Sequence, residues 1–243
     1  DAKPVIIIGD RDQRYKITPQ QLEEAITDKT RLFVINSPSN PTGMTYTKAE
    51  LEALGEVLRK YPDILIATDD MYELIYWADE PFYNGDSKAY SMTGWRIGYA
   101  GGPAQLIGAM KKIQSQSTSN PTSISQAASV EALNGDQGCV QTMLVEFKNR
   151  HDFVVEKLNQ MQGITALETD GTFYVFPDIS GVLANKPDLT DDMDFAEALL
   201  VEKGVAVVPG TAFGLKNHIR LSIATSESNL QNALQRIAEF IEQ

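Results

Sequence analysis

The stretch from residue 31 to residue 70, RLFVINSPSNPTGMTYTKAELEALGEVLRKYPDILIATDD, contains a strand, a helix and a second strand in order. The apolar segment 31–36 predicts a buried strand, and the turn residues SPSNPTG follow it. Thr47 and Glu50 form a capping-box pattern at the start of an amphipathic helix. The segment 63–70 predicts a second strand, which ends in two carboxylates. Strands connected in this way predict a parallel sheet covered by helices.

The residues before this stretch extend the same alternation. Residues 4–9, PVIIIG, are a short apolar run that predicts another strand. In residues 18–26, Thr18 is the expected N-cap, Pro19 takes the first helical position, and Gln21 closes a capping box. In such α/β sheets, ligands bind at the carboxyl ends of the strands, where SNPTG and TDDMYE lie in this sequence.

The remainder predicts three helices and then an α+β region. We expect a helix over 104–114, a second with Asn120 as N-cap and Pro121 in its first turn, and a long one from Gly138 to Met161. The further expected strands are 163–169, 171–179, 204–210 and 218–224, and the further expected helices are 191–204 and the stretch from Ser226. We therefore interpret residues 1–145 as part of a large domain and residues 146–243 as a smaller C-terminal domain.

Composition limits the classes of function. With 243 residues and 42% apolar content, the chain can build a sizeable globular core. Its net charge of −12 argues against a nucleic-acid partner, because phosphates would be repelled. Cys139 is the only cysteine, which favours a reducing cytoplasmic location, and we expect no membrane partner because no apolar run is long enough to span a bilayer.

One lysine stands in an unusual setting. Lys88 belongs to the run NGDSKAYSMTGWRIGYAGGP, residues 84–103, and its neighbours Ser87 and Ala89 keep bulk away from it. A lysine amine becomes nucleophilic when a nearby cation or a dry site removes its proton. These properties suit a lysine that forms a Schiff base with a carbonyl group.

Arg96 follows the lysine and is flanked by Gly94 and Gly98, which we expect to allow close backbone approach. Its planar guanidinium group can repel a protonated lysine and bind a phosphate. A Schiff-base lysine beside a phosphate-binding arginine describes a pyridoxal 5′-phosphate site, where the cofactor serves as an electron sink.

Three other segments supply candidate partners for this cofactor. Asp69 is a candidate to hold the ring nitrogen protonated, Asn40 and Tyr72 to contact the ring hydroxyl, and Arg220 to clamp a substrate carboxylate. Taken alone, each has an ordinary explanation as a turn, helix-cap, core or sheet-edge residue. Their combination and order favour the cofactor site.

The two histidines are interpreted as structural residues. His151 lies in the predicted long helix and His218 begins a predicted strand. Neither has metal-ligand spacing around it, so we expect no metal site.

The chain resembles the class I aminotransferase family of fold-type I pyridoxal-phosphate enzymes, above all its bacterial aspartate aminotransferase branch. The matching segments occur in the family's order and cover nearly the whole chain: VINSPSNPTG, ATDDMYE, NGDSKAYSMTGWRIGYAGGP, QSQSTSNPTSISQ, DGTFYVFPDISG, VVPGTAFG and HIRLSIATS. This resemblance implies a mostly parallel central sheet with flanking helices, a smaller C-terminal α+β domain and a homodimer.

The resemblance also implies roles for individual residues. Lys88 carries the cofactor and moves the proton during the reaction, and Asp69 partners the pyridine nitrogen. Asn40 and Tyr72 contact the ring hydroxyl. The phosphate is held by Ser87 and Arg96, and the substrate by Arg220 with Asn40.

The sequence departs from the family in two places. Family members have a long section before anything like DAKPVIIIGD, and more residues before the lysine, at a point that we place between Phe82 and Tyr83. We interpret the sequence as part of a longer polypeptide, with a truncated chain as the alternative. In family members, the long section before DAKPVIIIGD carries the aromatic residue that stacks on the cofactor ring and part of the phosphate site.

The expected activity is the transfer of an amino group between an amino acid, aspartate above all, and a 2-oxo acid such as 2-oxoglutarate. A prephenate-type aminotransferase and a β-eliminating lyase would use the same cofactor. A non-catalytic remnant that serves as an interaction module is the alternative from a different class.

Overall fold

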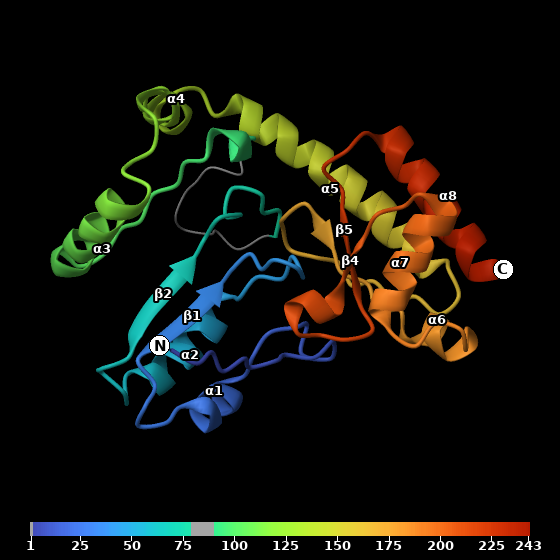
Figure 1. The fold of residues 1–243 in the computed structure, drawn as a ribbon, viewed down its shortest axis with the longest axis horizontal. Coiled ribbons are helices and arrows are strands. Elements are labelled where there is room, and N and C mark those ends of the chain that lie inside the picture. Colours follow the sequence, from blue (N-terminus) through green and yellow to red (C-terminus); the bar gives the residue numbers. More distant parts are fainter. Residues whose placement is uncertain (1, 79–89) are drawn as a thin grey trace.

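The computed structural model describes residues 2–78 and 90–243. Near the N-terminus, two short strands lie side by side in parallel, β1 (Leu32–Asn36) and β2 (Leu65–Asp69) (Figure 1). Their register pairs Leu32 with Leu65 and Asn36 with Asp69, so both strands end at the same edge. The parallel strand–helix–strand unit predicted from the sequence is therefore confirmed.

Two helices cover one face of this pair, α1 (Pro19–Ala25) and α2 (Lys48–Leu58). Both begin with the predicted capping box, since the Thr18 and Thr47 hydroxyls accept hydrogen bonds from the third helical residue and its side chain bonds back. A small core lies between helices and strands; its fully buried members are Leu22, Leu54, Val57 and Leu58, and Phe33 and Ile35 of β1 pack against it.

Two expectations for these strands are wrong. Residues 4–9 form no strand, because no described segment pairs with them, and Val5 and Ile6 are about 70% exposed (69% and 71%). Strand β1 is not buried on both faces: Leu32 and Val34 remain half exposed, because the helices cover only the opposite face. In the described residues the parallel sheet has two strands.

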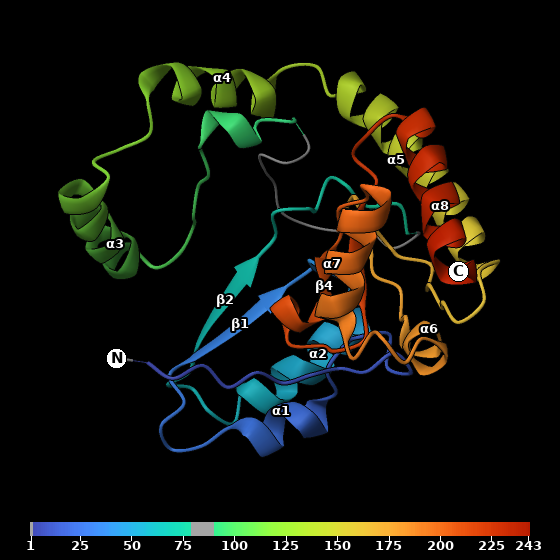
Figure 2. The same ribbon diagram turned by 45° about the vertical axis from the view of Figure 1, so that its right-hand side comes forward.

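Three helices then form an arch, α3 (Ala104–Ser117), α4 (Ser123–Asn134) and the long α5 (Gly138–Asn159) (Figure 2). The expected N-cap of α4, Asn120, is wrong, because the Thr122 hydroxyl accepts the bond from Ser125 N and the helix begins after the proline. None of the helices in the described residues is long and apolar enough to cross a membrane.

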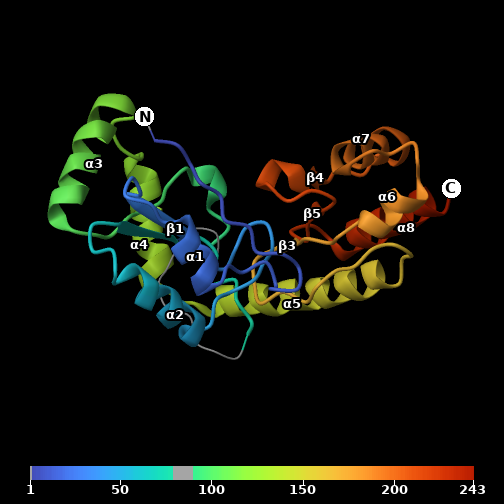
Figure 3. The same cartoon turned by 90° about the horizontal axis from the view of Figure 1, so that it is seen from below.

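The C-terminal part packs against the end of α5, at the opposite end of the molecule from α3 (Figure 3). An antiparallel sheet in the order β3-β5-β4 lies at its centre. The elements are β3 (Tyr174–Val175), α6 (Ser180–Asn185), α7 (Asp192–Lys203), β4 (Val208–Pro209), the 3₁₀ turn η2 (Gly210–Phe213), β5 (Ile219–Ser222) and α8 (Glu227–Glu242). The strand expected over 163–169 is reduced to a single bridge, from Thr165 to Asp178.

The larger hydrophobic core connects this C-terminal part to the segment after β2. It joins α5, the antiparallel sheet, α7 and α8, and it also contains Tyr72 and Ile75. The backbone of Ile75 accepts a hydrogen bond from Thr172 N at 2.7 Å. The residues that follow β2 are therefore built into the C-terminal core.

A second link attaches the turn after β1. The Gly43 carbonyl accepts hydrogen bonds from Asp170 N at 3.0 Å and Gly171 N at 3.1 Å. Gly43 has φ +69°, and a Cβ placed there would lie 2.7 Å from the Gly171 carbonyl oxygen, so only glycine fits this close approach.

Both histidines have structural contacts, as expected. His151 is buried, and its Nε2 accepts a hydrogen bond from Thr169 N at 3.0 Å while its Nδ1 lies 2.9 Å from Asp152 Oδ1. Burial lowers the pKa of His151 below its ordinary 6.5. His218 contacts the Lys216 carbonyl at 2.7 Å and the Tyr15 hydroxyl at 3.2 Å.

The depressed pKa of His151 predicts acid sensitivity of the fold. Below about pH 6.5 the unfolded chain binds a proton at this side chain that the folded chain does not, so the free energy of unfolding should fall as pH decreases. His151→Gln keeps an acceptor for Thr169 N but does not titrate. Urea unfolding at pH 7.5, 6.5 and 5.5 should show a smaller loss in the variant; equal losses would refute the assignment.

Candidate functional site

The polar residues after β1 and β2 are tied together by the side chain of Asn36. Its Nδ2 donates a hydrogen bond to the Asp69 carbonyl at 2.6 Å, and its Oδ1 accepts one from Asn40 N at 2.7 Å. The end of β2 and the turn that contains Asn40 are thereby held at one edge of the sheet. The peptide bonds preceding Pro38 and Pro41 in this turn are both cis.

Arg220 reaches this edge from the C-terminal sheet. Its Nη1 donates a hydrogen bond to Asn40 Oδ1 at 2.7 Å, although the two residues are 180 positions apart in sequence. Its guanidinium carbon lies 4.2 Å from the ring centre of Tyr174 and 4.9 Å from that of Phe213. One hydrogen bond and two cation–π contacts therefore restrict the orientation of this cation.

Tyr72 is linked to Arg220 through Tyr174. It is buried, and its hydroxyl donates a hydrogen bond to the Tyr174 hydroxyl at 3.4 Å. Burial raises its pKa well above 10, the Tyr174 hydrogen bond and the charge of Asp69 act in the same direction, and Arg220 opposes them. The Tyr72 phenol is therefore protonated at neutral pH.

Asp69 completes the group at the end of β2. Its side chain is exposed, and within residues 2–78 and 90–243 no hydrogen bond or ion pair engages its carboxylate. The structure thus brings together an accessible carboxylate, a neutral phenol, an amide and an oriented guanidinium group. Such a donor set suits an aromatic ring with a protonated nitrogen and a ring oxygen, next to a carboxylate ligand.

Of the residues predicted from sequence, Asn40 and Arg220 are joined directly by a hydrogen bond, and Tyr72 is linked to Arg220 through Tyr174. Asp69 is close enough to affect the pKa of Tyr72. Lys88 and Ser87 lie outside the described residues, as does the junction between Phe82 and Tyr83.

Arg96 is not joined to this group by any described contact. It is exposed, ends the 3₁₀ turn η1 (Thr93–Trp95) with φ +51°, and donates to the Thr93 carbonyl at 3.1 Å. The close backbone approach expected at Gly94 and Gly98 is not found in the described part of the chain, since a Cβ at either position meets nothing within 4 Å.

Sequence reasoning missed three residues of this site. Tyr174 and Phe213 lie within the segments DGTFYVFPDISG and VVPGTAFG, but nothing in either segment indicates a partner for Arg220. Asn36 is the last residue of the predicted strand, and the side-chain amide at that carboxyl end was the available signal.

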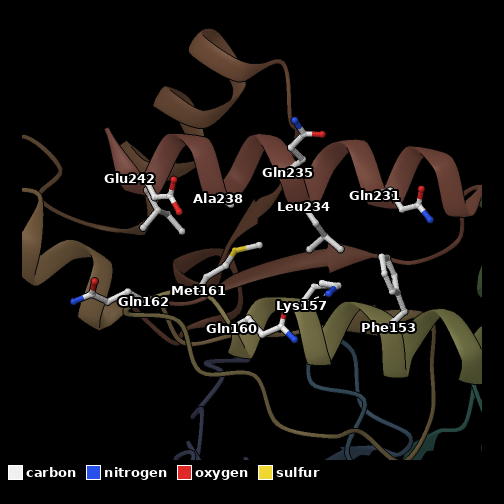
Figure 4. Close-up of a pocket in the computed structure, with 11 residues that line it drawn as sticks. Phe153, Lys157, Gln160, Met161, Gln162, Gln231, Leu234, Gln235, Ala238 and Glu242 are labelled. Atoms are coloured by element: carbon white, nitrogen blue, oxygen red, sulfur yellow. Dashed lines mark hydrogen bonds between the residues drawn. The ribbon is translucent and has the colours of Figure 1, made fainter.

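Two other kinds of functional site, a metal centre and a ligand cavity, find less support in the described residues. Among the residues that the structure describes, no group of three or more His, Cys, Asp or Glu residues could hold a metal ion. A cavity of about 650 Å³ lies between α5 and α8 (Figure 4). Its lining contains Phe153, Met161 and Leu234 with a rim of glutamines, and it includes none of the residues of the site above.

Comparisons with known proteins all point to the same family, the aminotransferases. A family model described as aminotransferase class I and II matches residues 3–237. An aspartate/prephenate aminotransferase of Nitrosomonas europaea is 49% identical over 99% of this chain, and an aspartate aminotransferase of Rhizobium meliloti is 45% identical over 98%.

Solved structures that resemble this fold are aminotransferases as well. The crystal structure of the aspartate aminotransferase from Rhizobium meliloti matches 99% of this chain with a TM-score of 0.91 at 44% identity. That of an aromatic aminotransferase from Pyrococcus horikoshii matches 99% with a TM-score of 0.90 at 32% identity. The described fold is therefore that of aminotransferases.

The match covers only part of each relative. The chain spans 66% of the Nitrosomonas protein and 63% of the Rhizobium protein by sequence, and 65% and 67% of the two solved chains. The alignment with the Nitrosomonas protein extends over 262 positions, 19 more than the 243 residues of this chain. This excess is consistent with residues of the relative that have no counterpart here.

The neutral state of Tyr72 can be measured directly. In Tyr72→Phe, the alkaline absorbance change at 295 nm should lack one phenol, and the difference from the wild type should develop only above pH 10. Loss of the long hydroxyl contact should lower the free energy of unfolding by at most about 1 kcal/mol. A difference that develops at or below pH 10 would show that Tyr72 is not buried as described.

Proposed function

The chain belongs to the aminotransferase class I and II family, and from this premise we propose that it transfers an amino group between an amino acid and a 2-oxo acid. The observation that carries the proposal is the meeting of Arg220 with Asn40, beside the protonated Tyr72 and the accessible Asp69. These residues combine a carboxylate-binding cation with partners for a pyridine ring.

The described residues fit pyridoxal 5′-phosphate by the chemistry of their donor set. When bound, this cofactor supplies an electron sink for negative charge at the substrate α-carbon. Asp69 would partner the ring nitrogen, and the Asn40 amide would donate a hydrogen bond to the ring oxygen. The Tyr72 hydroxyl would donate to the same oxygen in exchange for its long bond to Tyr174. Ser87 and Arg96 are proposed for the phosphate group on the strength of the sequence.

Two residues of the chain are proposed to act on the substrate. Arg220 binds the α-carboxylate with its planar fork, and the contacts with Asn40, Tyr174 and Phe213 hold that fork in one orientation. Lys88 carries the cofactor and then moves the proton at the α-carbon as a general base.

We propose L-aspartate as the amino donor and 2-oxoglutarate as the acceptor, because several relatives that are 42–49% identical bear the name aspartate aminotransferase or aspartate/prephenate aminotransferase. Prephenate is the second candidate acceptor, because the Nitrosomonas relative is named for both substrates. A β-eliminating lyase would instead release pyruvate and ammonia without any 2-oxo acid.

The larger architecture is proposed by the same reasoning. Residues 1–145 belong to the large domain of a fold-type I enzyme and residues 146–243 to its small domain. The enzyme is proposed to act as a homodimer in the cytoplasm.

Lys88 provides the sharpest test of the activity. A visible spectrum with and without added pyridoxal 5′-phosphate, on protein of measured intact mass, should show cofactor attachment in the wild type and its loss in Lys88→Ala. Turnover of L-aspartate with 2-oxoglutarate should fall by more than about 10⁴-fold, because one residue supplies both the covalent link and the proton transfer. A wild-type protein that gains no absorbance from the cofactor would refute the proposed function.

Arg220 tests carboxylate recognition separately. Arg220→Lys keeps the charge and loses the planar fork, so kcat/KM for L-aspartate should fall roughly 10- to 100-fold while the cofactor stays bound. β-Alanine, which is aspartate without its α-carboxylate, serves as the control amine. Equal losses for L-aspartate and β-alanine would remove Arg220 from the carboxylate site.

A further inference from the structure

Asp192 has a fully buried carboxylate in the first turn of α7. Its Oδ2 accepts a hydrogen bond from Thr211 N at 2.7 Å, and its Oδ1 accepts bonds from the Thr211 hydroxyl at 2.9 Å and Asn217 N at 3.1 Å. All three donors belong to the segment 210–218, which we call the β4–β5 loop. One carboxylate therefore holds residues near both ends of this loop.

These bonds do not serve the start of α7. That task belongs to Asp191, the N-cap, whose side chain accepts hydrogen bonds from Met193 N and Asp194 N. Asp192 directs all three of its described hydrogen bonds to the β4–β5 loop instead. Since a buried carboxylate without donors is strongly unfavourable, the loop and the carboxylate depend on each other.

The β4–β5 loop leads directly to Arg220. The strands on either side of it pair Val208 with Arg220, and the loop is closed by a hydrogen bond from Gly210 N to the His218 carbonyl at 2.7 Å. Phe213 lies within the loop, with its ring centre 4.9 Å from the Arg220 guanidinium carbon. The position of Phe213 over the guanidinium group is therefore set by the part of the loop that Asp192 anchors.

We propose that Asp192 is a positioning residue for substrate recognition, which anchors the β4–β5 loop so that Phe213 holds the Arg220 guanidinium ready for a carboxylate. This inference rests on the proposed function, in which Arg220 binds the substrate. Without the anchor, Phe213 leaves the guanidinium group and Arg220 samples more orientations. Substrate carboxylate then binds more weakly, while the proton-transfer step is affected little.

The test compares Asp192→Asn, Asp192→Ala and the matched control Asp191→Ala in the cofactor-loaded enzyme. Asp192→Asn conserves volume and places an N–H against one donor of the loop, and it serves if the alanine variant does not fold. The Asp192 variants should raise KM for L-aspartate about tenfold, with kcat within about twofold of the wild type and the β-alanine reaction unchanged. Asp191→Ala should lower Tm by removing a helix cap and leave KM unchanged.

A purely structural role would give a different pattern. If the Asp192 variants lower Tm as Asp191→Ala does and leave KM for L-aspartate at the wild-type value, the proposal is overturned. Equal losses for L-aspartate and β-alanine overturn it as well. Amide hydrogen exchange adds a direct readout, because the β4–β5 loop should exchange faster in Asp192→Asn while α8 keeps its protection.

Measurements on the wild type distinguish a failure of the proposed function from a failure of the positioning role. If the wild type binds L-aspartate in calorimetry but does not transfer its amino group, the proposed function fails, and about tenfold weaker binding in Asp192→Asn still supports the positioning role. Unchanged binding in that variant overturns it. A wild type that neither reacts with L-aspartate nor binds it overturns both.

Discussion

The structure depends on a backbone contact between the turn after β1 and the segment before β3. Gly43 offers its carbonyl to two consecutive N–H groups, those of Asp170 and Gly171, and the Asp170 carboxylate accepts a hydrogen bond from Thr45 N at 2.9 Å. Because Gly43 has no side chain, the two segments approach more closely than any other residue at this position would allow. This contact attaches the turn that carries Asn40 to the C-terminal part of the chain.

The site follows from that attachment. Asn40 is anchored on one side by Asn36 of the parallel sheet and meets Arg220 of the antiparallel sheet on the other. The segment after β2 is built into the C-terminal core, and this places Tyr72 against Tyr174, the ring on which the Arg220 guanidinium group lies. The group is thus assembled from two sheets, and it contains a neutral phenol and a restrained cation. Preorganised donors of this kind need little rearrangement when an anionic ligand binds.

Local signals in the sequence were sufficient where a few neighbouring residues decide the structure. The capping boxes at Thr18 and Thr47 predicted the starts of α1 and α2 correctly, because both partners of each bond lie three residues apart. The expected strand over residues 4–9 and the buried character of β1 were wrong, because pairing and burial depend on segments distant in the chain. Asn120 failed as an N-cap because Thr122, past the proline, offers the better start.

By itself, the sequence determined the parallel strand–helix–strand unit, the candidate residues Asn40, Asp69, Tyr72 and Arg220, and the family that their order resembles. Only the tertiary structure decided that Arg220 is held by Asn40, Tyr174 and Phe213, and that the buried Asp192 is hydrogen-bonded to the loop that carries Phe213. The reason is physical: side-chain periodicity and caps act over a few residues, whereas these contacts join positions up to 180 residues apart, which only packing brings together.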